Sequence, residues 1–204
     1  MTALQADTPR LVLASASASR RAVLEGAGLR FTVQPASIDE GEVKRAARAD
    51  GASADDTALL LADLKAQRVA RRDPEALVIG CDQLLVCGDR WFDKPADVAE
   101  ARAHLLALRG RTHELVTAVL CRRGNQRLWH HVARPRLTVR MFGAAFLDAY
   151  LAAEGNAVTG TVGAYRLEGL GVHLFDAVQG EHAAILGLPL LPLLGFLRQH
   201  GVLM

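Results

Sequence analysis

Residues 11–21 read LVLASASASRR, an apolar run that gives way to serines and paired arginines. Ser15, Ser17 and Ser19 alternate with alanines, and Arg20 follows them directly. A strand that enters a helix at this point would direct backbone N–H groups, hydroxyls and a guanidinium toward one place, which is the chemistry of a phosphate-binding site. The alternative is an N-capping serine followed by two solvated arginines, and this stretch alone favours neither.

Two carboxylate groups have the chemistry of a base or a metal ligand. Asp82 stands in VIGCDQ, after four apolar or glycine residues, so we expect it in a buried strand. Aspartate is depleted in strands, and a buried one needs a metal ion, a role as a base, or the backbone amides that satisfy an ordinary structural aspartate. The acidic run DEGE at 39–42, which contains Glu40, either holds a divalent cation or is a solvated loop.

Three further charged residues, Lys65, Lys94 and Glu168, indicate a function only when the sequence around each is considered. Lys65 falls at the edge of the apolar face of a helical pattern, and Lys94 follows a hairpin pattern in DKP; either lysine by itself is typical of a solvated surface. Glu168 lies in GAYRLEGLG at 163–171, where the glycines let backbone approach a ligand closely. Its carboxylate could accept hydrogen bonds from the N1–H and 2-amino group of a guanine, an arrangement that no pyrimidine offers. A turn glutamate in water is the alternative.

A basic segment supports a rival class of protein. No acidic residue occurs from Leu115 to Leu147, whereas six arginines do: Arg122, Arg123, Arg127, Arg134, Arg136 and Arg140. A basic β-ribbon over 122–140 could bind nucleic acid, flank a triphosphate, or form a solvated edge that resists strand pairing. The formal net charge of +2 does not by itself mark a nucleic-acid-binding protein.

The elements that must position these residues alternate between strand and helix. Apolar patterns predict strands at 10–14, 29–35 and 76–87 and helices at 19–27 and 56–72. The other expected elements are a polar loop at 36–53, a hairpin turn at 88–89, a helix from Asp97 to Gly110, strands at 112–121 and 126–140, a helix at 143–152, a glycine-rich β segment at 160–180 and a helix from about Leu190. Because hairpins occur among alternating elements, we expect an α/β protein with a mixed sheet.

Short apolar runs and the cysteine pattern indicate the cellular compartment of the protein. The apolar run at 11–13 is too short for a secretory signal, and residues 1–9 contain no basic residue. The run ILGLPLLPLLGFL at 185–197 contains two prolines and is shorter than the roughly 20 residues of a membrane helix. Three cysteines without CxxC spacing are typical of reduced thiols. We therefore expect a cytoplasmic protein without a membrane partner, in one domain over 1–204.

Five motifs in chain order resemble the Maf-like nucleoside triphosphate pyrophosphatases: ASASASRR, IGCDQ, Lys94–Pro95, GRTHE at 110–114, and GAYRLEGLG followed by GLPL at 187–190. The resemblance implies a Maf-like, inosine-triphosphatase-like fold, with a mixed twisted sheet flanked by helices in two lobes around a central cleft. It implies hydrolysis of a nucleoside triphosphate to monophosphate and pyrophosphate with a divalent metal, Mg²⁺ or Mn²⁺, which removes unwanted nucleotides. It also implies a homodimer as a partner state, since homodimers are common in the family.

Carried over residue by residue, the resemblance assigns roles in the reaction. Asp82 becomes the base, which activates a water for attack at the α-phosphorus either alone or through the metal. Glu40 becomes the second metal ligand beside Asp82. Arg20, helped by Ser15 or Ser17, holds the triphosphate. Lys65 and Lys94 neutralise charge on the departing pyrophosphate.

The resemblance also bears on the substrate. The branch that acts on dTTP and UTP typically carries an arginine, a threonine and a glutamine where this chain has Ser19, Gln83 and Glu168. Gln83 and Glu168 resemble the branch that acts on 7-methyl-GTP, and Glu168 agrees with the guanine argument. We expect all three residues to bind substrate. The alternatives are a dTTP/UTP pyrophosphatase of the same family, a nucleic-acid-binding protein that uses 122–140, and a regulator that binds nucleotide without turning it over.

Overall fold

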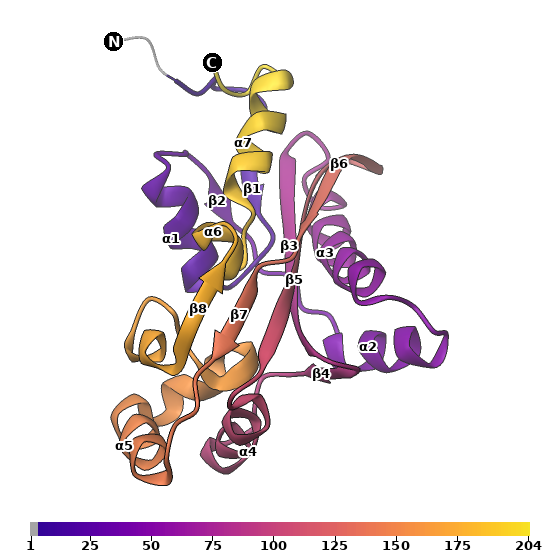
Figure 1. Cartoon of the computed structure of the whole chain (residues 1–204). Helices are drawn as coiled ribbons and strands as arrows, with labels where there is room; N and C mark the ends of the chain where they lie inside the picture. The colour runs from indigo at the N-terminus through magenta and orange to yellow at the C-terminus, as the bar shows by residue number, and fades with distance from the viewer. Residues whose placement is uncertain (1–3) are drawn as a thin grey trace. The chain divides into compact units, whose positions relative to one another are not determined.

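The computed structural model of the chain describes residues 4–204, which form two compact units (Figure 1). The first unit consists of the described residues up to Asp82, Thr117–Ala133 and His182–Met204. The second unit consists of Gln83–Val116 and Arg134–Glu181. Residues 1–3, which the predicted domain over 1–204 includes, lie outside the described part, and the single catalytic domain stays a prediction.

The strands of the first unit pair in both directions. β1 (Leu11–Leu13) pairs in parallel with β2 (Thr32–Val33) and with the start of β3 (Leu77–Cys87). The second half of β5 (Thr112–Arg123) pairs antiparallel with β6 (Gln126–Ala133). All three residues of β1 are buried, as its continuous apolar run predicts for a parallel strand covered on both faces.

Helices cover these strands and complete the core of the first unit. They are α1 (Ala18–Gly26), α2 (Glu40–Ala49), α3 (Ala54–Ala70), α6 (His182–Ile185) and α7 (Leu190–Gln199). The helix α3 contacts α2 and β6, and α7 contacts β6. One buried cluster joins β1, β3, α1 and α7, and it includes Leu13, Leu24, Ile79, Phe196 and Leu197. The site described below therefore rests on a packed apolar base.

The second unit is built around hairpins. The end of β3 pairs antiparallel with β4 (Arg90–Phe92) across a turn in which Gly88 has a φ of +61°. The first half of β5 pairs with β7 (Arg136–Val139), which pairs with β8 (Phe175–Gln179). The helices are α4 (Val98–Leu108) and α5 (Ala144–Glu154), followed by 3₁₀ segments at Gly155–Gly160, Val162–Ala164 and Leu170–Leu174.

The predicted α/β class with mixed strands flanked by helices is confirmed, but three predicted segments were wrong. The polar loop at 36–53 contains helix α2. The strand at 126–140 is two strands interrupted at Pro135, which has no N–H to donate to a ladder. The β segment at 160–180 consists of turns, short 3₁₀ segments and one strand, β8. The central cleft between two lobes stays a prediction.

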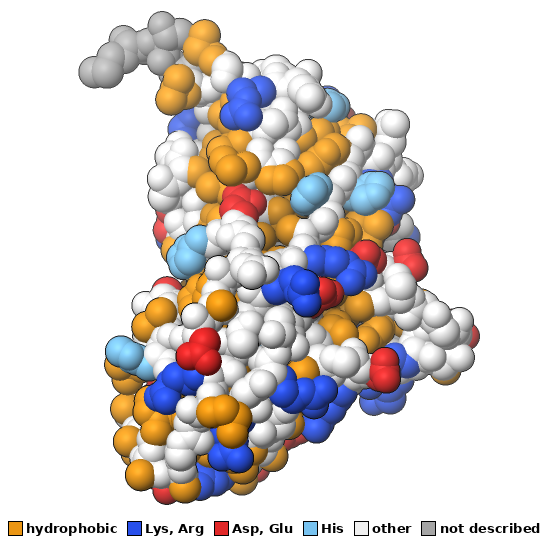
Figure 2. All heavy atoms as spheres, in the orientation of Figure 1, with side chains coloured by type: hydrophobic (Ala, Val, Ile, Leu, Met, Phe, Trp, Pro, Cys, Tyr) orange, Lys and Arg blue, Asp and Glu red, His pale blue; other side chains and the backbone are white. Residues whose placement is uncertain are grey.

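The C-terminal apolar run belongs partly to the core and partly to the surface. Leu193, Phe196 and Leu197 are buried, whereas Leu191 is 67% exposed. Figure 2 shows apolar side chains gathered around α7 on this face. No helix within residues 4–204 is both long and apolar enough to cross a bilayer. The homodimer stays a prediction.

Candidate functional site

The serine-rich stretch forms the passage from β1 into α1. Ser17 is the N-cap of α1, and its Oγ accepts a hydrogen bond from the backbone N–H of Arg20 at 3.4 Å. Ser15 Oγ accepts from the backbone N–H of Ser17 at 3.2 Å. Ser19 lies in the first turn of the helix. The predicted N-capping serine is therefore confirmed at Ser17, and Ser15 lies just before it at the positive end of the helix dipole; phosphate binding here stays a prediction.

Arg20 joins three motifs that are far apart in the chain. Its Nη1 donates to Ser15 Oγ and to the carbonyl oxygen of Cys81, both at 3.1 Å. Its Nε donates to the carbonyl oxygen of Gly187 at 2.9 Å. Gly187 has a φ of +96°, and a Cβ there would lie 2.9 Å from Arg20 Nε, so the position requires glycine. The guanidinium is therefore held in place at the residue before Asp82.

Asp82 and Glu40 share one lysine. Lys65 Nζ lies 2.5 Å from Asp82 Oδ1 and 2.6 Å from Glu40 Oε1. The side chains of Lys65 and Asp82 are 9% and 5% exposed, whereas that of Glu40 is 42% exposed. A buried carboxylate is costly unless it is paired, and Lys65 supplies the pairing charge. Asp82 Oδ2 is buried and has no hydrogen-bond partner in the described part of the chain.

The pairing of Lys65 with Asp82 depends on close contact between α3 and β3. Side chains alternate along a strand, so Gly80 and Asp82 share the face of β3 that α3 covers. A Cβ at Gly80 would overlap the carbonyl oxygen of Ala62 and lie 2.8 Å from Ala66 Cβ. The absent side chain at Gly80 lets α3 approach the strand, and Lys65 on the same helix then reaches Asp82.

The acidic run DEGE is the start of a helix, which corrects the loop expectation. Asp39 caps α2, and its Oδ1 accepts from the backbone N–H of Glu42 at 2.9 Å. Glu40 and Glu42 lie in the first turn, where negative charge is favourable at the helix N-terminus. Only Glu40 of these acids pairs with Lys65, since α2 packs against α3. Glu40 and Asp82 therefore both contact Lys65, and the role of Glu40 as a metal ligand stays a prediction.

The carboxylate oxygens of Glu40 and Asp82 are suitable ligands for a hard divalent cation whose other ligands are also oxygen atoms. The described residues contain no group of three or more His, Cys, Asp and Glu placed to hold a metal. The carboxylates of Glu40 and Asp82 nevertheless both contact Lys65 Nζ, and the buried Asp82 Oδ2 has no hydrogen-bond partner among residues 4–204. Mg²⁺ is commonly held by one or two carboxylates together with substrate phosphates. The residues present fit that mode of binding.

Three predicted residues lie in the second unit. Gln83 directly follows Asp82 along β3 and is half-buried, whereas Lys94 and Glu168 are exposed. Lys94 stands between β4 and α4, and Glu168 stands in the turn before the last 3₁₀ segment. Their predicted roles in binding substrate and charge stay predictions.

The thiols beside the site are not nucleophiles. Burial raises the pKa of Cys81 to about 11 and raises the pKa of Cys121 well above its usual range. Both thiols are therefore protonated near neutral pH, and only the thiolate is reactive. All three cysteines, including Cys87, are free and buried.

The arginines of the 122–140 ribbon have partners. Arg122 Nη1 lies 2.5 Å from Asp63 Oδ1, and Arg140 Nε donates to the carbonyl oxygen of His173 at 2.7 Å. The other ion pairs are Arg123–Glu75, Arg127–Asp63, Arg134–Glu114 and Arg136–Glu114. A surface that binds phosphates along a nucleic acid needs uncompensated positive charge, and these ion pairs supply three carboxylates for the six arginines, so only part of this charge is compensated. The ribbon therefore carries less uncompensated charge than its sequence indicates, and nucleic-acid binding stays an alternative.

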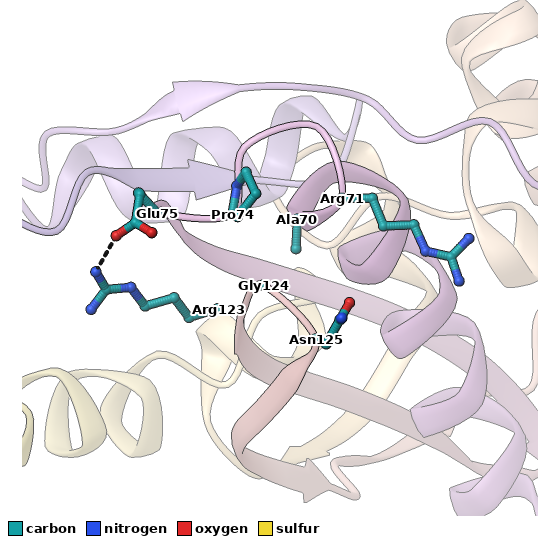
Figure 3. A pocket seen from close by; sticks show the side chains of 7 residues that line it. All are labelled: Ala70, Arg71, Pro74, Glu75, Arg123, Gly124 and Asn125. Carbon is teal, nitrogen blue, oxygen red and sulfur yellow. Dashed lines mark hydrogen bonds and ion pairs between the residues drawn. The ribbon is translucent and has the colours of Figure 1, made fainter.

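A hollow of about 550 Å³ lies beside the C-terminal end of α3 (Figure 3). Its lining is Ala70, Arg71, Pro74, Glu75, Arg123, Gly124 and Asn125, and the Arg123–Glu75 ion pair lies along its wall. None of these seven is a predicted site residue.

Sequence reasoning missed the residues that hold the site together. Gly80 and Gly187 act through close approach to α3 and to Arg20, and the carbonyl oxygen of Cys81 acts as an acceptor. A glycine inside an apolar strand run was the available signal for Gly80, since it marks close approach of another segment. No local signal exists for a carbonyl that accepts from a distant arginine.

This arrangement defines an α/β protein with a buried carboxylate, a lysine shared by two carboxylates, and serine hydroxyls at a helix N-terminus. A family model described as Maf-like protein matches residues 10–200. The chain belongs to the Maf-like family, which confirms the resemblance seen in the five motifs.

Relatives with related names cover nearly all of the chain. A nucleoside triphosphate pyrophosphatase of Granulibacter bethesdensis is 57% identical and aligns with 95% of this chain and 98% of that protein. A protein of the same name from Rhodospirillum rubrum is 51% identical, over 98% of this chain and all of that protein. A 7-methyl-GTP pyrophosphatase of Rhizobium etli is 47% identical, over 96% of this chain and 98% of that protein.

Proposed function

We propose that the chain hydrolyses 7-methyl-GTP to 7-methyl-GMP and pyrophosphate, with Asp82 as the base. The chain is a hydrolase of the nucleoside triphosphate pyrophosphatase class, on the evidence of its family and of relatives up to 57% identical over most of its length. The observation that carries the proposed mechanism is the buried Asp82 carboxylate, which pairs with Lys65 through one oxygen while the other has no partner in the described chain.

Phosphate binding falls to the passage from β1 into α1. The Arg20 guanidinium donates through Nε to Gly187 and through Nη1 to Ser15 and Cys81, and Nη2 takes part in none of these three bonds. That group, the hydroxyls of Ser15 and Ser17, and the N–H groups at the start of α1 would bind phosphate oxygens. Because Arg20 is already anchored, little conformational freedom is lost when the phosphate binds.

Cleavage of the α–β anhydride would begin at Asp82. Its carboxylate accepts a proton from a water, the water oxygen forms a bond to the α-phosphorus, and the bond from that phosphorus to the bridging oxygen of the β-phosphate breaks. Lys65 and Lys94 would stabilise negative charge on the departing pyrophosphate. A divalent cation held by Glu40, Asp82 and the phosphates would supply further positive charge at the reacting oxygens.

Base recognition is assigned to Glu168, with Gln83 and Ser19 as further substrate-binding residues. A carboxylate can accept from both N1–H and the 2-amino group of guanine. Methylation at N7 makes the ring cationic, which adds charge attraction to the same carboxylate. Several relatives that are 45–47% identical are named 7-methyl-GTP pyrophosphatases, which supports a methylated purine for this chain. We also place the reaction in the cytoplasm, because three free buried thiols suit a reducing compartment.

The test is pyrophosphate release from 7-methyl-GTP, GTP, ITP, dTTP and UTP, with Mg²⁺ or Mn²⁺ and after removal of metal by a chelator. Asp82→Asn is compared with Glu75→Gln, a matched loss of charge at a surface ion pair. We expect 7-methyl-GTP to be the best substrate and Asp82→Asn to lower kcat at least ~10²-fold, while Glu75→Gln changes nothing. Release of orthophosphate alone, or an active Asp82→Asn variant, would overturn the mechanism. A preference for dTTP or UTP would overturn only the purine assignment.

A further inference from the structure

The loop that carries Glu168 begins in a conformation that L-amino acids rarely adopt. Gly163 has a φ of +79° and Ala164 a φ of +61°. Ala164 is the one residue other than glycine with positive φ in the described part of the chain. Such a conformation persists only where the surroundings impose it, and it is concentrated at functional sites. The contacts that impose it can be followed residue by residue from 164 to 166.

Ala164 is held by a tyrosine of α5. Tyr150 Oη donates to the carbonyl oxygen of Ala164 at 3.1 Å, and both residues are buried. On the next residue of the loop, Thr161 Oγ1 donates to the carbonyl oxygen of Tyr165 at 2.8 Å. These bonds act on the loop backbone itself, so they fix its path independently of its side chains.

Tyr165 is held by a histidine of β5. Its hydroxyl lies 2.7 Å from His113 Nε2, and both side chains are buried. The tyrosine ring also meets Phe175 edge to face, with ring centroids 4.8 Å apart. His113 Nδ1 is buried without a hydrogen-bond partner among residues 4–204. A nitrogen left unsatisfied is a cost that an apolar side chain at this position would avoid.

Arg166 is held by the last residue of α5. Its Nε and Nη2 donate to Glu154 Oε2 at 3.0 and 2.8 Å, and this hydrogen-bonded pair raises the pKa of Arg166. The Glu154 side chain is only 2% exposed and lies at a helix C-terminus, where the helix dipole disfavours negative charge. A carboxylate placed there is costly without its arginine, so the pair ties the loop to α5.

The turn then closes on Arg166. The N–H of Gly169 donates to the carbonyl oxygen of Arg166 at 3.2 Å. A Cβ at Gly171 would lie 2.7 Å from Arg166 N and would overlap the carbonyl oxygen, so the backbones of these two residues touch. Glu168 stands on the exposed side of this closed turn, two residues beyond the anchored arginine.

We infer that Glu154, Tyr150 and His113 are positioning residues that present Glu168 to the purine base; this rests on the proposed function. Tyr150 and Glu154 are four residues apart on α5 and therefore lie on one face of the helix. Together with His113 they hold residues 164, 165 and 166 at one point each. The network contains a buried carboxylate and an unsatisfied nitrogen, which stability alone does not call for, whereas a preorganised reader of the base needs one defined geometry.

The test compares Glu154→Gln, Glu168→Gln and the double variant by kcat and KM on 7-methyl-GTP and on dTTP. Glutamine keeps the size of Glu154 and removes its buried charge, so the fold survives. Tyr150→Phe, which removes only a hydroxyl, is a second probe of the same network. Asp148→Asn is the matched control, because Asp148 lies on the same helix in an ion pair with Arg102 outside the network.

We expect Glu168→Gln to lower kcat/KM for 7-methyl-GTP about 10–100-fold, mainly through KM, with little effect on dTTP. Glu154→Gln and Tyr150→Phe should raise KM for 7-methyl-GTP about 5–20-fold at nearly constant kcat. In the Glu168→Gln background the effect of Glu154→Gln should vanish, since it acts through Glu168.

The possible failures are distinguishable. If Glu168→Gln lowers kcat/KM and Glu154→Gln does not, the positioning inference fails and the proposed function stands. The inference also fails if Glu154→Gln lowers kcat on both nucleotides equally or adds fully to Glu168→Gln, because that is the behaviour of a purely structural residue. If Glu168→Gln leaves 7-methyl-GTP turnover unchanged, purine reading by Glu168 is wrong and the inference falls with it.

Discussion

A methyl group added at Gly80 tests whether close packing of α3 on β3 creates the site. In Gly80→Ala the new Cβ would stand 2.8 Å from Ala66 Cβ and would overlap the carbonyl oxygen of Ala62. Carbon atoms in contact lie at about 3.5–4.0 Å, so α3 has to move away from the strand by roughly 0.7–1.2 Å. Lys65 is carried on that helix, and its 2.5 Å contact with Asp82 lengthens with the shift.

The expected magnitudes follow from two opposing effects. Overpacking of a closed core costs about 1–3 kcal/mol, and alanine offsets about 0.5–1 kcal/mol of this because glycine is the more flexible residue when unfolded. We therefore expect a net loss of about 1–2 kcal/mol in the free energy of unfolding. A displacement approaching 1 Å at a catalytic group costs up to about 10²-fold in rate, so kcat/KM should fall about 10–100-fold.

The assay is chemical denaturation together with pyrophosphate release at a temperature where the variant is folded. Gly195→Ala is the matched control, because a Cβ there meets nothing closer than 4.0 Å and the position is helical. It should gain up to about 1 kcal/mol in stability and keep full activity. A Gly80→Ala protein with unchanged stability and unchanged activity would refute the dependence of Lys65 on this packing.

Three further predictions follow from the same contacts. Gly187→Ala should lower kcat/KM about 10-fold with a rise in KM, because its Cβ would displace Arg20; steady-state kinetics on 7-methyl-GTP measure this, and an unchanged KM would contradict it. Lys65→Met should destabilise the protein by about 3–5 kcal/mol, since Asp82 would be left buried and unpaired; denaturation by urea measures the loss, and the double variant with Asp82→Asn should recover much of it. Burial lowers the pKa of His113 from 6.5 to about 4 in the folded protein. As the pH falls below about 6.5, the imidazole is therefore protonated in the unfolded chain and still neutral in the folded one. The free energy of unfolding should then decrease by about 3 kcal/mol between pH 6.5 and pH 4. His113→Gln should flatten that pH dependence of the unfolding free energy, and an unchanged slope would show that other groups cause it.

Elements that depend on neighbouring residues could be predicted from the sequence. The apolar runs predicted β1 and β3, because buried parallel strands need nothing but continuous apolar residues. The helix α4 was predicted from its ends: Asp97 Oδ1 accepts from the N–H of Glu100, and Gly110 follows the helix with a φ of +69°. The N-cap at Ser17 belongs to the same class of local feature.

Elements held by distant contacts could not be predicted in this way. The helix α2 buries a single residue, Ala47, and its segment is mostly polar and small, so its contact with α3 is needed to stabilise it. The turns around residues 164–166 have no strand ladder and are held by α5 instead: Tyr150 donates to the carbonyl oxygen of Ala164, and Glu154 accepts from the side chain of Arg166.

The same distinction between local features and distant contacts applies to the residues of the candidate site. The sequence by itself determined which residue types were available: the serines and Arg20 after an apolar strand, Asp82 after another, and a lysine on a helix. Only the tertiary structure decided that Arg20 bonds to Gly187, 167 residues away, and that Lys65 lies between Glu40 and Asp82. The reason is physical: capping and strand patterns act over a few residues, whereas pairing of buried charges depends on how closely a helix packs against a strand.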